Sequence, residues 1–419
     1  MTLVKVATIN SQLDTLNEHM STQNGILARM LAQNTPENVD YKDIALAVRN
    51  KYAKLIYPVG TQIVVPWVDK SDNNKEYQMP FDVVDYGPAE LRNGEIVEDA
   101  MYLQSHYTLP FQTQFCHQRA FLRCPDGLAA GTYYFTYIGQ AWGQNLKTNT
   151  VVCFTLTKPI PEGGRIAGLY DVSNQPMSNW RIYSFEADAK TQIETVTPIF
   201  EISDGAVNLG DMQYSTRNGD INSIQETSYG WNRYSGSAAD QYLNSTADKD
   251  EWWTQRDGWD IAPDHLSSKP GFMSGLDASF IDVLSEIKIQ TAVNTVQDKN
   301  DIGSDFETTL DKIFLASLEQ EYVKPQLSGI EGRSWEYWKQ RLGLKQPQEW
   351  YSPGINTRHI RYTLNGQTYP MNVRLRSAYR DDAYITWYVS NSSGGVYSHN
   401  FASDSNFRFC PACVITGII

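Results

Sequence analysis

The chain has 419 residues, of which 41% are hydrophobic, 20% charged and 12% aromatic, which is typical of a globular protein and excludes a disordered one. The formal net charge of −13 argues against broad binding to nucleic-acid phosphates, because that mode needs a basic face. No apolar run approaches the roughly 20 residues of a membrane helix, so we expect no membrane insertion.

The first 34 residues carry a heptad-like pattern. Apolar residues from Val6 to Met30 follow the alternating 3-4 spacing of heptad a and d positions, broken only at Gln23. The pattern predicts a coiled-coil helix over residues 1–34 that trimerises the chain or attaches it to a partner. A single amphipathic helix packed on its own protein is the alternative. The segment from Met1 to Asp14 lacks the apolar core of a signal peptide, so we expect no secretory export.

Residues 35–165 are expected to form a β-rich domain. Asp40 can cap a short helix that places Ile44, Val48 and Leu55 on one face. From there the hydrophobic period becomes that of strands separated by turns, as in a β-sandwich or jelly-roll-like spacer. The expected strands cover 61–67, 78–85, 101–108, 131–138 and 150–156.

The pattern after residue 165 is mixed. We expect helices at 237–245, 315–322 and 335–342. Strands are expected at 180–185, 280–289 (partly helical), around Ile313, and at 361–364, 373–377, 384–389 and 411–415. A polar loop over 390–407 is long enough to be functional. The expected fold class is therefore α+β, with an N-terminal coiled-coil helix, a β-sandwich-like domain and a C-terminal domain.

The cysteines and histidines do not indicate a catalytic or metal site. Five cysteines at irregular spacing do not form a disulfide framework and indicate a reducing site of synthesis. Cys410 and Cys413 have the spacing of a redox dithiol or half a zinc site, but no second pair exists and no helix is expected after Cys413. We interpret them as partly buried strand residues. The six histidines show no metal-binding spacing, and no serine-hydrolase motif occurs.

An aromatic cluster supports one enzymatic alternative. Trp252, Trp253 and Trp259 lie close in sequence to Asp257 and Asp260. Glycosidases pair carboxylates beside aromatic stacking surfaces, so this cluster is compatible with a glycan depolymerase. An aromatic cluster in the protein core is the other interpretation.

The strongest local feature is the composition of residues 373–409. Of these 37 residues, 17 are Ser, Tyr, Asn or Asp, and none is Lys, Glu, Gln or Met. The whole segment 350–419 lacks Lys and Glu and carries a formal charge of +3, which leaves −16 for the rest of the chain. Antibody-like paratopes have this composition, because Tyr gives rigid contact area and Ser and Asn give adaptable hydrogen bonds. A solvated loop would be expected to contain Lys and Glu. The composition therefore favours a binding surface.

The same segment resembles the C-terminal end of variable proteins of diversity-generating retroelements. Most of those are phage receptor-binding or bacterial surface-display proteins. The resemblance rests on the runs 373–380 (VRLRSAYR), 386–387 (TW), 394–396 (GGV) and 410–415 (CPACVI). Upstream, the runs 229–235 (YGWNRYS), 241–245 (QYLNS) and 335–343 (WEYWKQRLG) look like the framework of the same group, so the resemblance covers about 165–419 well. The segment 57–67, which begins YPVGTQ, is suggestively similar.

The resemblance implies a C-type-lectin fold of the formylglycine-generating-enzyme type over residues 166–419, with a variable region at about 373–409. In that system template adenines are copied with errors, which yields side chains that exclude Lys, Glu, Gln, Met and Trp. The fixed framework residues would be Arg374, Leu375, Arg376, Ser377, Ala378, Arg380, Ala383, Thr386, Trp387, Val389, Gly395, Val396, Arg408 and Pro411. The displayed, ligand-binding residues would be Tyr379, Asp381, Asp382, Tyr384, Ile385, Tyr388, Ser390, Asn391, Tyr397, His399, Asn400, Phe401, Ser403, Asp404, Asn406 and Phe407.

The sequence departs from the related patterns in three places. Asp240 stands where the framework usually has a basic residue. None of the calcium-site tripeptides of sugar-binding lectins occurs, so calcium-dependent sugar binding is not implied. Cys410 and Cys413 do not match the paired cysteines of the formylglycine enzyme, and sharing a fold does not imply sharing that chemistry.

The sequence thus predicts a non-enzymatic receptor-binding protein of a phage or prophage, made in the bacterial cytoplasm and carried on the virion tail or fibre. Its partners would be a bacterial cell-surface protein or glycan, further copies of itself in a homotrimer, and other virion proteins through the N-terminus. No cofactor, metal or nucleic acid is expected. The alternatives are a tail glycan depolymerase and a structural head fibre or decoration protein.

Overall fold

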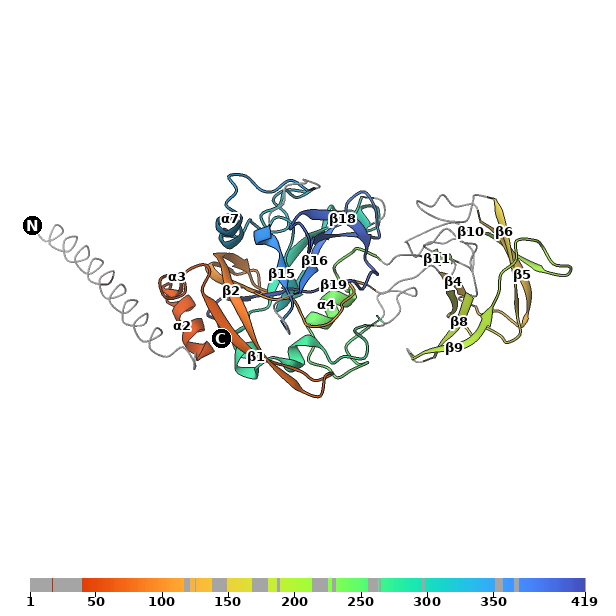
Figure 1. Cartoon of the computed structure of the whole chain (residues 1–419), viewed down its shortest axis with the longest axis horizontal. Coiled ribbons are helices and arrows are strands. Elements are labelled where there is room, and N and C mark those ends of the chain that lie inside the picture. The colour runs from red at the N-terminus through yellow and green to blue at the C-terminus, as the bar shows by residue number, and fades with distance from the viewer. Residues whose placement is uncertain are drawn as a thin grey trace, which may run out of the picture.

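The computed structural model describes most of the chain after residue 39. The described residues are 17, 40–116, 121–124, 126–137, 149–167, 180–186, 189–212, 225–227, 231–254, 263, 265–295, 298–350, 357–364 and 369–418. They form two separate units, a main body and an inserted β unit, each with its own apolar core. Figure 1 shows the two units with the elements labelled.

The described residues are predominantly β. The longest described helix, α2 (Tyr41–Arg49), has nine residues, whereas strand β2 (Lys75–Glu90) has sixteen. The expected α+β class is therefore wrong, and the described part of the chain contains no long coiled-coil helix. The heptad pattern itself falls on 1–34, which apart from Asn17 lie outside the described residues. Nor does any helix in the described ranges have the length and apolarity needed to cross a bilayer.

A five-stranded sheet in the order β1-β2-β3-β20-β14 forms the centre of the main body. All neighbouring strands in it are antiparallel. Besides β2, its strands are β1 (Gln62–Asp69), β3 (Ile96–Ser105), β14 (Ile313–Leu315) and β20 (Pro411–Ile415). Exposed and buried residues alternate along most of β1, as expected where one face lies on a core. The expected strands at 61–67, 78–85, 101–108 and 411–415 are confirmed, with bounds shifted by a few residues in all but the last.

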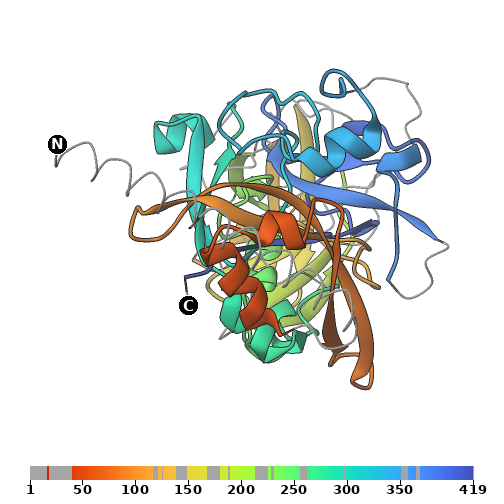
Figure 2. The same ribbon diagram turned by 90° about the vertical axis from the view of Figure 1, so that its left-hand side faces the viewer.

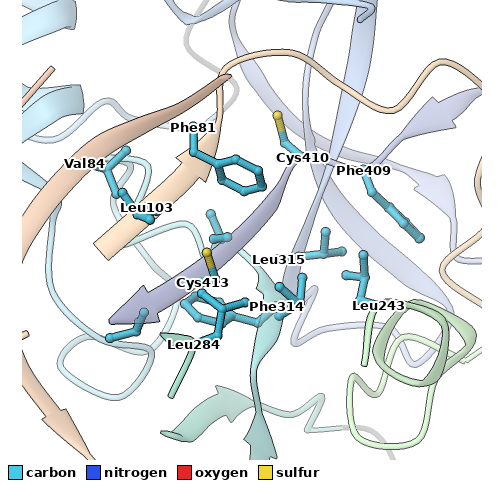
Figure 3. Close-up of a cluster of buried hydrophobic side chains, with 14 of the residues drawn as sticks. Phe81, Val84, Leu103, Leu243, Leu284, Phe314, Leu315, Phe409, Cys410 and Cys413 are labelled. Atoms are coloured by element: carbon cyan, nitrogen blue, oxygen red, sulfur yellow. The ribbon is translucent and has the colours of Figure 1, made fainter. Parts of the chain in front are cut away.

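The C-terminal strand β20 lies inside this sheet and is completely buried. Cys413 is paired with Leu103 of β3 on one side and with Ile313 of β14 on the other. Figure 3 shows its thiol among apolar side chains that include Leu103 and Phe314. The last strand of the chain thus joins the N-terminal strands to a strand from the middle of the sequence.

Two short helices lie beside the end of the chain. Asp40 caps α2 by accepting a backbone N–H of its first turn, as the sequence predicts, and α3 (Ala53–Ile56) follows directly. Gly417 has φ +78°, and a Cβ there would lie 2.5 Å from the backbone nitrogen of Arg49. Glycine is therefore required where the C-terminus passes α2, an arrangement visible in Figures 1 and 2.

The inserted unit consists of two sheets, ordered β10-β5-β6 and β11-β4-β7-β8-β9. Its strands are β4 (Phe121–Cys124), β5 (Gly131–Tyr137), β6 (Thr150–Leu156), β7 (Gly164–Ala167), β8 (Trp180–Glu186), β9 (Ala189–Val196), β10 (Val207–Met212) and β11 (Gln225–Thr227). Phe135 stacks on Trp180 with 6.1 Å between ring centroids, and Phe154 packs against the same indole at 5.5 Å. These rings lie in a core separate from that of the main body.

The structure divides the chain differently from the expected domains 35–165 and 166–419. Residue 165 lies within β7, in the inserted unit, so the expected boundary cuts through one strand. Residues 40–116 belong to the main body because β1, β2 and β3 share a sheet with β14 and β20. Strand spacing along the sequence is similar in both units, and it does not reveal that the chain leaves one sheet and later returns to it.

The remaining elements of the main body follow the sequence pattern in part. They are α4 (Ala238–Leu243), η1 (Phe272–Gly275), α5 (Ala278–Val283), β12 (Ile287–Ala292), α6 (Asp298–Ile302), β13 (Phe306–Asp311), α7 (Glu336–Leu342) and η2 (Thr357–His359). The helices expected at 237–245 and 335–342 are confirmed, and the segment 280–289 divides between α5 and β12. The helix expected at 315–322 is wrong, because Leu315 ends β14 and the Gln320 side chain accepts the N–H of Ser317.

A second sheet, ordered β15-β16-β17-β18, carries the C-terminal stretch. Its strands are β15 (Arg361–Tyr362), β16 (Pro370–Ala378), β17 (Ile385–Val389) and β18 (Val396–Phe401), and the short β19 (Phe407–Arg408) also pairs with β16. The polar loop expected over 390–407 is therefore wrong in part, since it contains β18. Its serines and asparagines concealed the strand because such residues are uncommon in strands.

A fully buried polar network ties the central sheet to the β15-β16-β17-β18 sheet. Glu321 has no exposed side-chain surface and lies 2.9 Å from Nε2 of His359 and 3.5 Å from Arg361. Gln104 of β3 donates to the same carboxylate. Burial alone would raise the pKa of Glu321, but Arg361 and His359 outweigh burial, and the pKa lies below its usual value.

We predict that Glu321→Gln lowers the free energy of unfolding by about 3–5 kcal/mol, because it leaves the buried Arg361 without its counter-charge. Urea unfolding at pH 7 measures the change. The matched control is Glu349→Gln, since Glu349 pairs with Lys324 on the surface and both side chains are more than half exposed. Equal stability of the two variants would contradict the assigned role of the network.

Candidate functional site

The two faces of the β15-β16-β17-β18 sheet differ in character. Side chains alternate along β16, so that Val373 and Leu375 enter the main core while Arg374 points to the other side. Cross-strand pairing places Tyr388 beside Arg374, and Tyr397 beside Tyr388. We call the side that carries Arg374, Tyr388 and Tyr397 the outer face.

The residues expected to be framework are buried. All of them lie below the surface except Arg408, which is half-buried. Trp387 has no exposed surface and lies between the rings of Tyr379 and Trp350, at 5.6 Å from each. These positions therefore form the interior on which the displayed residues rest.

Most residues expected to be displayed are at least partly exposed. Asp381 and Asn406 are exposed, and the side chain of His399 lies outside the described residues. The half-buried members are Tyr379, Asp382, Ile385, Tyr388, Asn391, Tyr397, Asn400, Phe401, Ser403 and Asp404. They come from β17, β18 and the turns at their ends, so the structure brings them onto one part of the main body.

Three displayed positions are buried instead. Tyr384 and Ser390 are 8% exposed, and Phe407 is 1% exposed. Phe407 lies over the guanidinium of Arg374, with 3.6 Å between Cζ and the ring centroid, and its ring is 5.0 Å from that of Tyr388. Phe407 therefore supports the outer face from beneath and does not present its ring to a partner.

Asn232 fixes the turn between β16 and β17. Its side-chain amide donates to the backbone carbonyls of Tyr379 (3.0 Å), Asp382 (2.8 Å) and Ile385 (2.6 Å). Its own backbone N–H donates to the carbonyl of Ala383 at 2.9 Å. Asn232 is completely buried, and all four bonds reach main-chain atoms. They would form whatever side chains stood at these four positions.

Arg374 fixes the turn after β18 in the same way. Its guanidinium donates to the carbonyls of Phe401 (3.0 Å) and Asp404 (3.1 Å), and to the hydroxyl of Thr386. Burial lowers the pKa of Arg374 to about 9. Gln114 adds a bond of 3.0 Å to the carbonyl of Ser403.

Arg376 and Arg380 anchor β16 to the rest of the main body. Arg376 donates to the carbonyls of Leu315 (2.9 Å) and Glu331 (2.7 Å). Arg380 donates to the carbonyls of Val293 and Asp305, both at 3.0 Å, and also pairs with the Asp305 carboxylate. Each of the three buried arginines thus donates to backbone carbonyls of other segments. A framework role for each would depend on these bonds.

Cys410 and Cys413 are placed as buried side chains. Both are free thiols with 1% exposure or less. Burial raises the pKa of Cys410 to about 12 and raises that of Cys413 as well. Thiols of this kind are unreactive, so a redox or zinc role has no support. Within the described residues, no group of three or more His, Cys, Asp or Glu side chains is placed to hold a metal ion.

In the aromatic cluster near residue 252, Trp252 packs in the core, and other members lie outside the described residues. Trp252 is 5% exposed, packs on Tyr242 and donates from its indole to the carbonyl of Lys269 at 2.8 Å. Trp253 is half-buried. Trp259, Asp257 and Asp260 lie outside the described residues. The stacking platform of the depolymerase alternative therefore lacks Trp252.

A buried carboxyl pair includes Asp240. Asp240 of α4 and Asp311 at the end of β13 are hydrogen-bonded to each other. Asp240 also accepts the N–H of Gly236 at 2.8 Å, and Thr309 donates to Asp311 at 2.6 Å. Burial raises the pKa of both carboxyls, and Asp240 raises that of Asp311 further. Two carboxyls in contact disfavour double ionisation, so the pair keeps a proton to higher pH than an isolated carboxyl does.

The sequence did not reveal the clamping role of Asn232 or Gln114. Asn232 lies in the run 229–235 that carries the resemblance, and this is the feature of the sequence that draws attention to it. Nothing in the run indicates which hydrogen bonds its side chain makes. Gln114 had no local sign, because it lies far from Ser403 in sequence.

Comparison with known proteins gives one match. Residues 210–417 match the profile of a domain family described as a domain of unknown function, DUF6273. No curated protein sequence and no solved structure matches the chain. The matched range covers residues 373–409, Asn232 and β20, but not β1, β2 or β3.

We predict that Asn232→Ala destabilises the protein by about 3 kcal/mol, because it leaves three buried carbonyls without their donor. Urea unfolding measures the loss, and limited proteolysis should show earlier cleavage within 379–385. Asn406→Ala is the control, since that side chain is exposed. Unchanged cleavage in the Asn232 variant would contradict the clamp.

The Asp240–Asp311 pair predicts a stability that falls as pH rises. Because the pKa of each carboxyl is raised in the folded state, their contribution is fully present below the unfolded-state value near 3.9 and is lost as pH rises through the folded-state pKa. We expect Asp311→Asn to reduce the pH dependence of the unfolding free energy above the unfolded-state pKa. Asp72→Asn, an exposed carboxylate, should leave the slope unchanged. An unaltered slope in the Asp311 variant would refute the shared proton.

Proposed function

We propose that the protein is a non-enzymatic receptor-binding protein of a phage or prophage, whose C-terminal stretch presents a variable contact surface to a bacterial cell. One observation carries the proposal above all. Buried side chains hold this stretch through its backbone carbonyls, so its shape depends little on which side chains it displays.

The division between buried and accessible positions supports the same proposal. In β17, Thr386, Trp387 and Val389 are buried, whereas Ile385 before them and Tyr388 between Trp387 and Val389 are half-buried. A protein that changes its recognition residues needs such a separation, because substitutions at buried positions destabilise the fold. The half-buried positions can change at small cost in stability.

The aromatic side chains supply the contact energy in this proposal. Tyr388 and Tyr397 lie 6.0 Å apart between ring centroids on the outer face, and both are partly exposed. Tyrosine combines a large apolar area with a hydroxyl and loses little entropy on binding, so it is frequent at binding hot spots. Residues 350–419 contain no Lys or Glu, and four of their six arginines are buried.

We expect the double variant Tyr388→Ala/Tyr397→Ala to lose at least tenfold in cell binding, the effect of removing about 1.4 kcal/mol of contact energy. Labelled protein is incubated with a panel of bacterial isolates, and bound label is measured by flow cytometry. Phe200→Ala is the matched control, because Phe200 is an aromatic residue of the inserted unit with 43% exposure.

Equal labelling by the double variant and the wild type would contradict the proposal. Related genomes give an independent test. Differences should concentrate at the half-buried and exposed positions of 379–406, whereas a structural head fibre or decoration protein would show them evenly spread.

A further inference from the structure

The main body contains a cavity of about 620 Å³ that the proposed function does not use. It lies between the end of the β2–β3 hairpin and the paired strands β12 and β13, and its described lining includes none of the displayed residues. Ligand pockets typically have volumes of about 300–1,000 Å³ and combine an apolar lining with a few placed polar groups. The volume of this cavity therefore fits a small molecule.

Strand register places one set of side chains around the mouth of the cavity. Glu90 is paired with Ile96, and Gln290 with Thr308, so each pair points to one side of its sheet. Lys288 lies two residues before Gln290 and therefore on the same side. It bridges to Glu90 with 2.5 Å between Nζ and Oε1. This ion pair joins the two pairs of strands, and Ile96, Gln290 and Thr308 are exposed around it.

Buried polar side chains lie at the inner end of the cavity. Gln320, Glu331 and Arg376 all line it, and each is 4% exposed or less. The guanidinium of Arg376 makes five hydrogen bonds, one for each of its N–H groups. The Glu331 carboxylate accepts the N–H of Ala292 and the hydroxyl of Ser377. Both charged groups are therefore satisfied within the protein.

Gln320 differs because one of its polar atoms is left over. Its Oε1 accepts the N–H of Ser317 at 3.0 Å and a second bond from Arg376, which fixes the orientation of the amide. Within the described part of the chain, its Nε2 makes no hydrogen bond. Gly332 leaves this nitrogen uncovered, because a Cβ at that position would lie 3.1 Å from it. A buried donor without an acceptor is unfavourable, and the oxygen of a ligand would satisfy it.

The charges around the cavity balance. The charged lining residues are two carboxylates and two cations: Glu90, Glu331, Lys288 and Arg376. Beside the cavity, Arg333 lies against Gly87 and pairs with the Asp85 carboxylate at 2.7 Å. A ligand in this cavity therefore meets no unpaired charge among the described side chains, and a neutral ligand requires no counter-charge.

We infer that this cavity binds a small neutral molecule that has an apolar body and a carbonyl oxygen, with that oxygen accepting the Nε2–H of Gln320. A carbonyl oxygen only accepts hydrogen bonds, which matches a group that only donates. The apolar body would contact Ile96, Tyr102 and Ile330 of the lining. The site is independent of the proposed receptor-binding surface, because the two share no described residue.

The test uses the full-length protein and two neutral fluorescent probes of similar size. Prodan carries a ketone oxygen, whereas N-phenyl-1-naphthylamine has no oxygen, and the emission of both changes when they leave water. We expect Prodan to bind with one-to-one saturation and Gln320→Glu to weaken that binding about tenfold. Glutamate keeps the acceptor for Ser317 and Arg376 but lacks the donor. The same variant should not weaken the binding of the naphthylamine.

A second variant blocks the mouth of the cavity without touching its inner end. Thr308→Trp puts a large ring at an exposed lining position and should weaken both probes about tenfold. Thr155→Trp is the matched control, because Thr155 is an exposed threonine of strand β6 in the inserted unit. Thermal unfolding verifies that each variant is folded.

Three results would each overturn the inference: no saturable binding of Prodan by the wild type, no loss of Prodan affinity in Thr308→Trp, or equal weakening of both probes in Gln320→Glu. Cell labelling that depends on Tyr388 and Tyr397 is a separate readout. The receptor-binding proposal is therefore judged by that labelling alone, whichever of these results is obtained.

Discussion

The position of β20 between β3 and β14 is the constraint on which the main body depends. Its five residues are buried, and Cys413 is paired on both sides. Central strands of a sheet satisfy all their backbone groups through neighbours, so β20 cannot move without opening two ladders at once. Residues 373–409 end just before this strand, so one end of that segment is fixed to a fully buried central strand.

Buried arginines give the second sheet an unusual form of support. Arg374, Arg376 and Arg380 lie within a few residues of one another on or beside β16, and each donates to carbonyls of other segments. A buried cation is costly unless its donors are satisfied, so these bonds resist distortion of the segments they reach. The shape of the segments that these bonds hold therefore depends little on which accessible side chains those segments carry.

The sequence predicted local structure better than long-range arrangement. β6 and β20 have the expected bounds, because alternation and flanking turns define them locally. The α+β class failed because strands predominate among the described residues. The helix at 315–322 failed because side-chain bonds, such as the one that Gln320 accepts from the N–H of Ser317, override the helical periodicity. Trp387, expected to be a framework residue, is completely buried. The clamp by Asn232 depends on a contact 147 residues away, which no local pattern reveals.

The inserted unit joins the main body at two neighbouring points. Before the insertion, the N–H of Cys116 donates to the carbonyl of Ala402 at 3.2 Å, and after it the N–H of Asn232 donates to that of Ala383 at 2.9 Å. The N–H of Ala402 in turn donates to the carbonyl of Tyr384 at 2.8 Å, so both attachments meet within residues 373–409. A mechanical load on the inserted unit would therefore act first on the bonds that hold residues 383, 384 and 402, and so on the turn before β17 and the turn after β18.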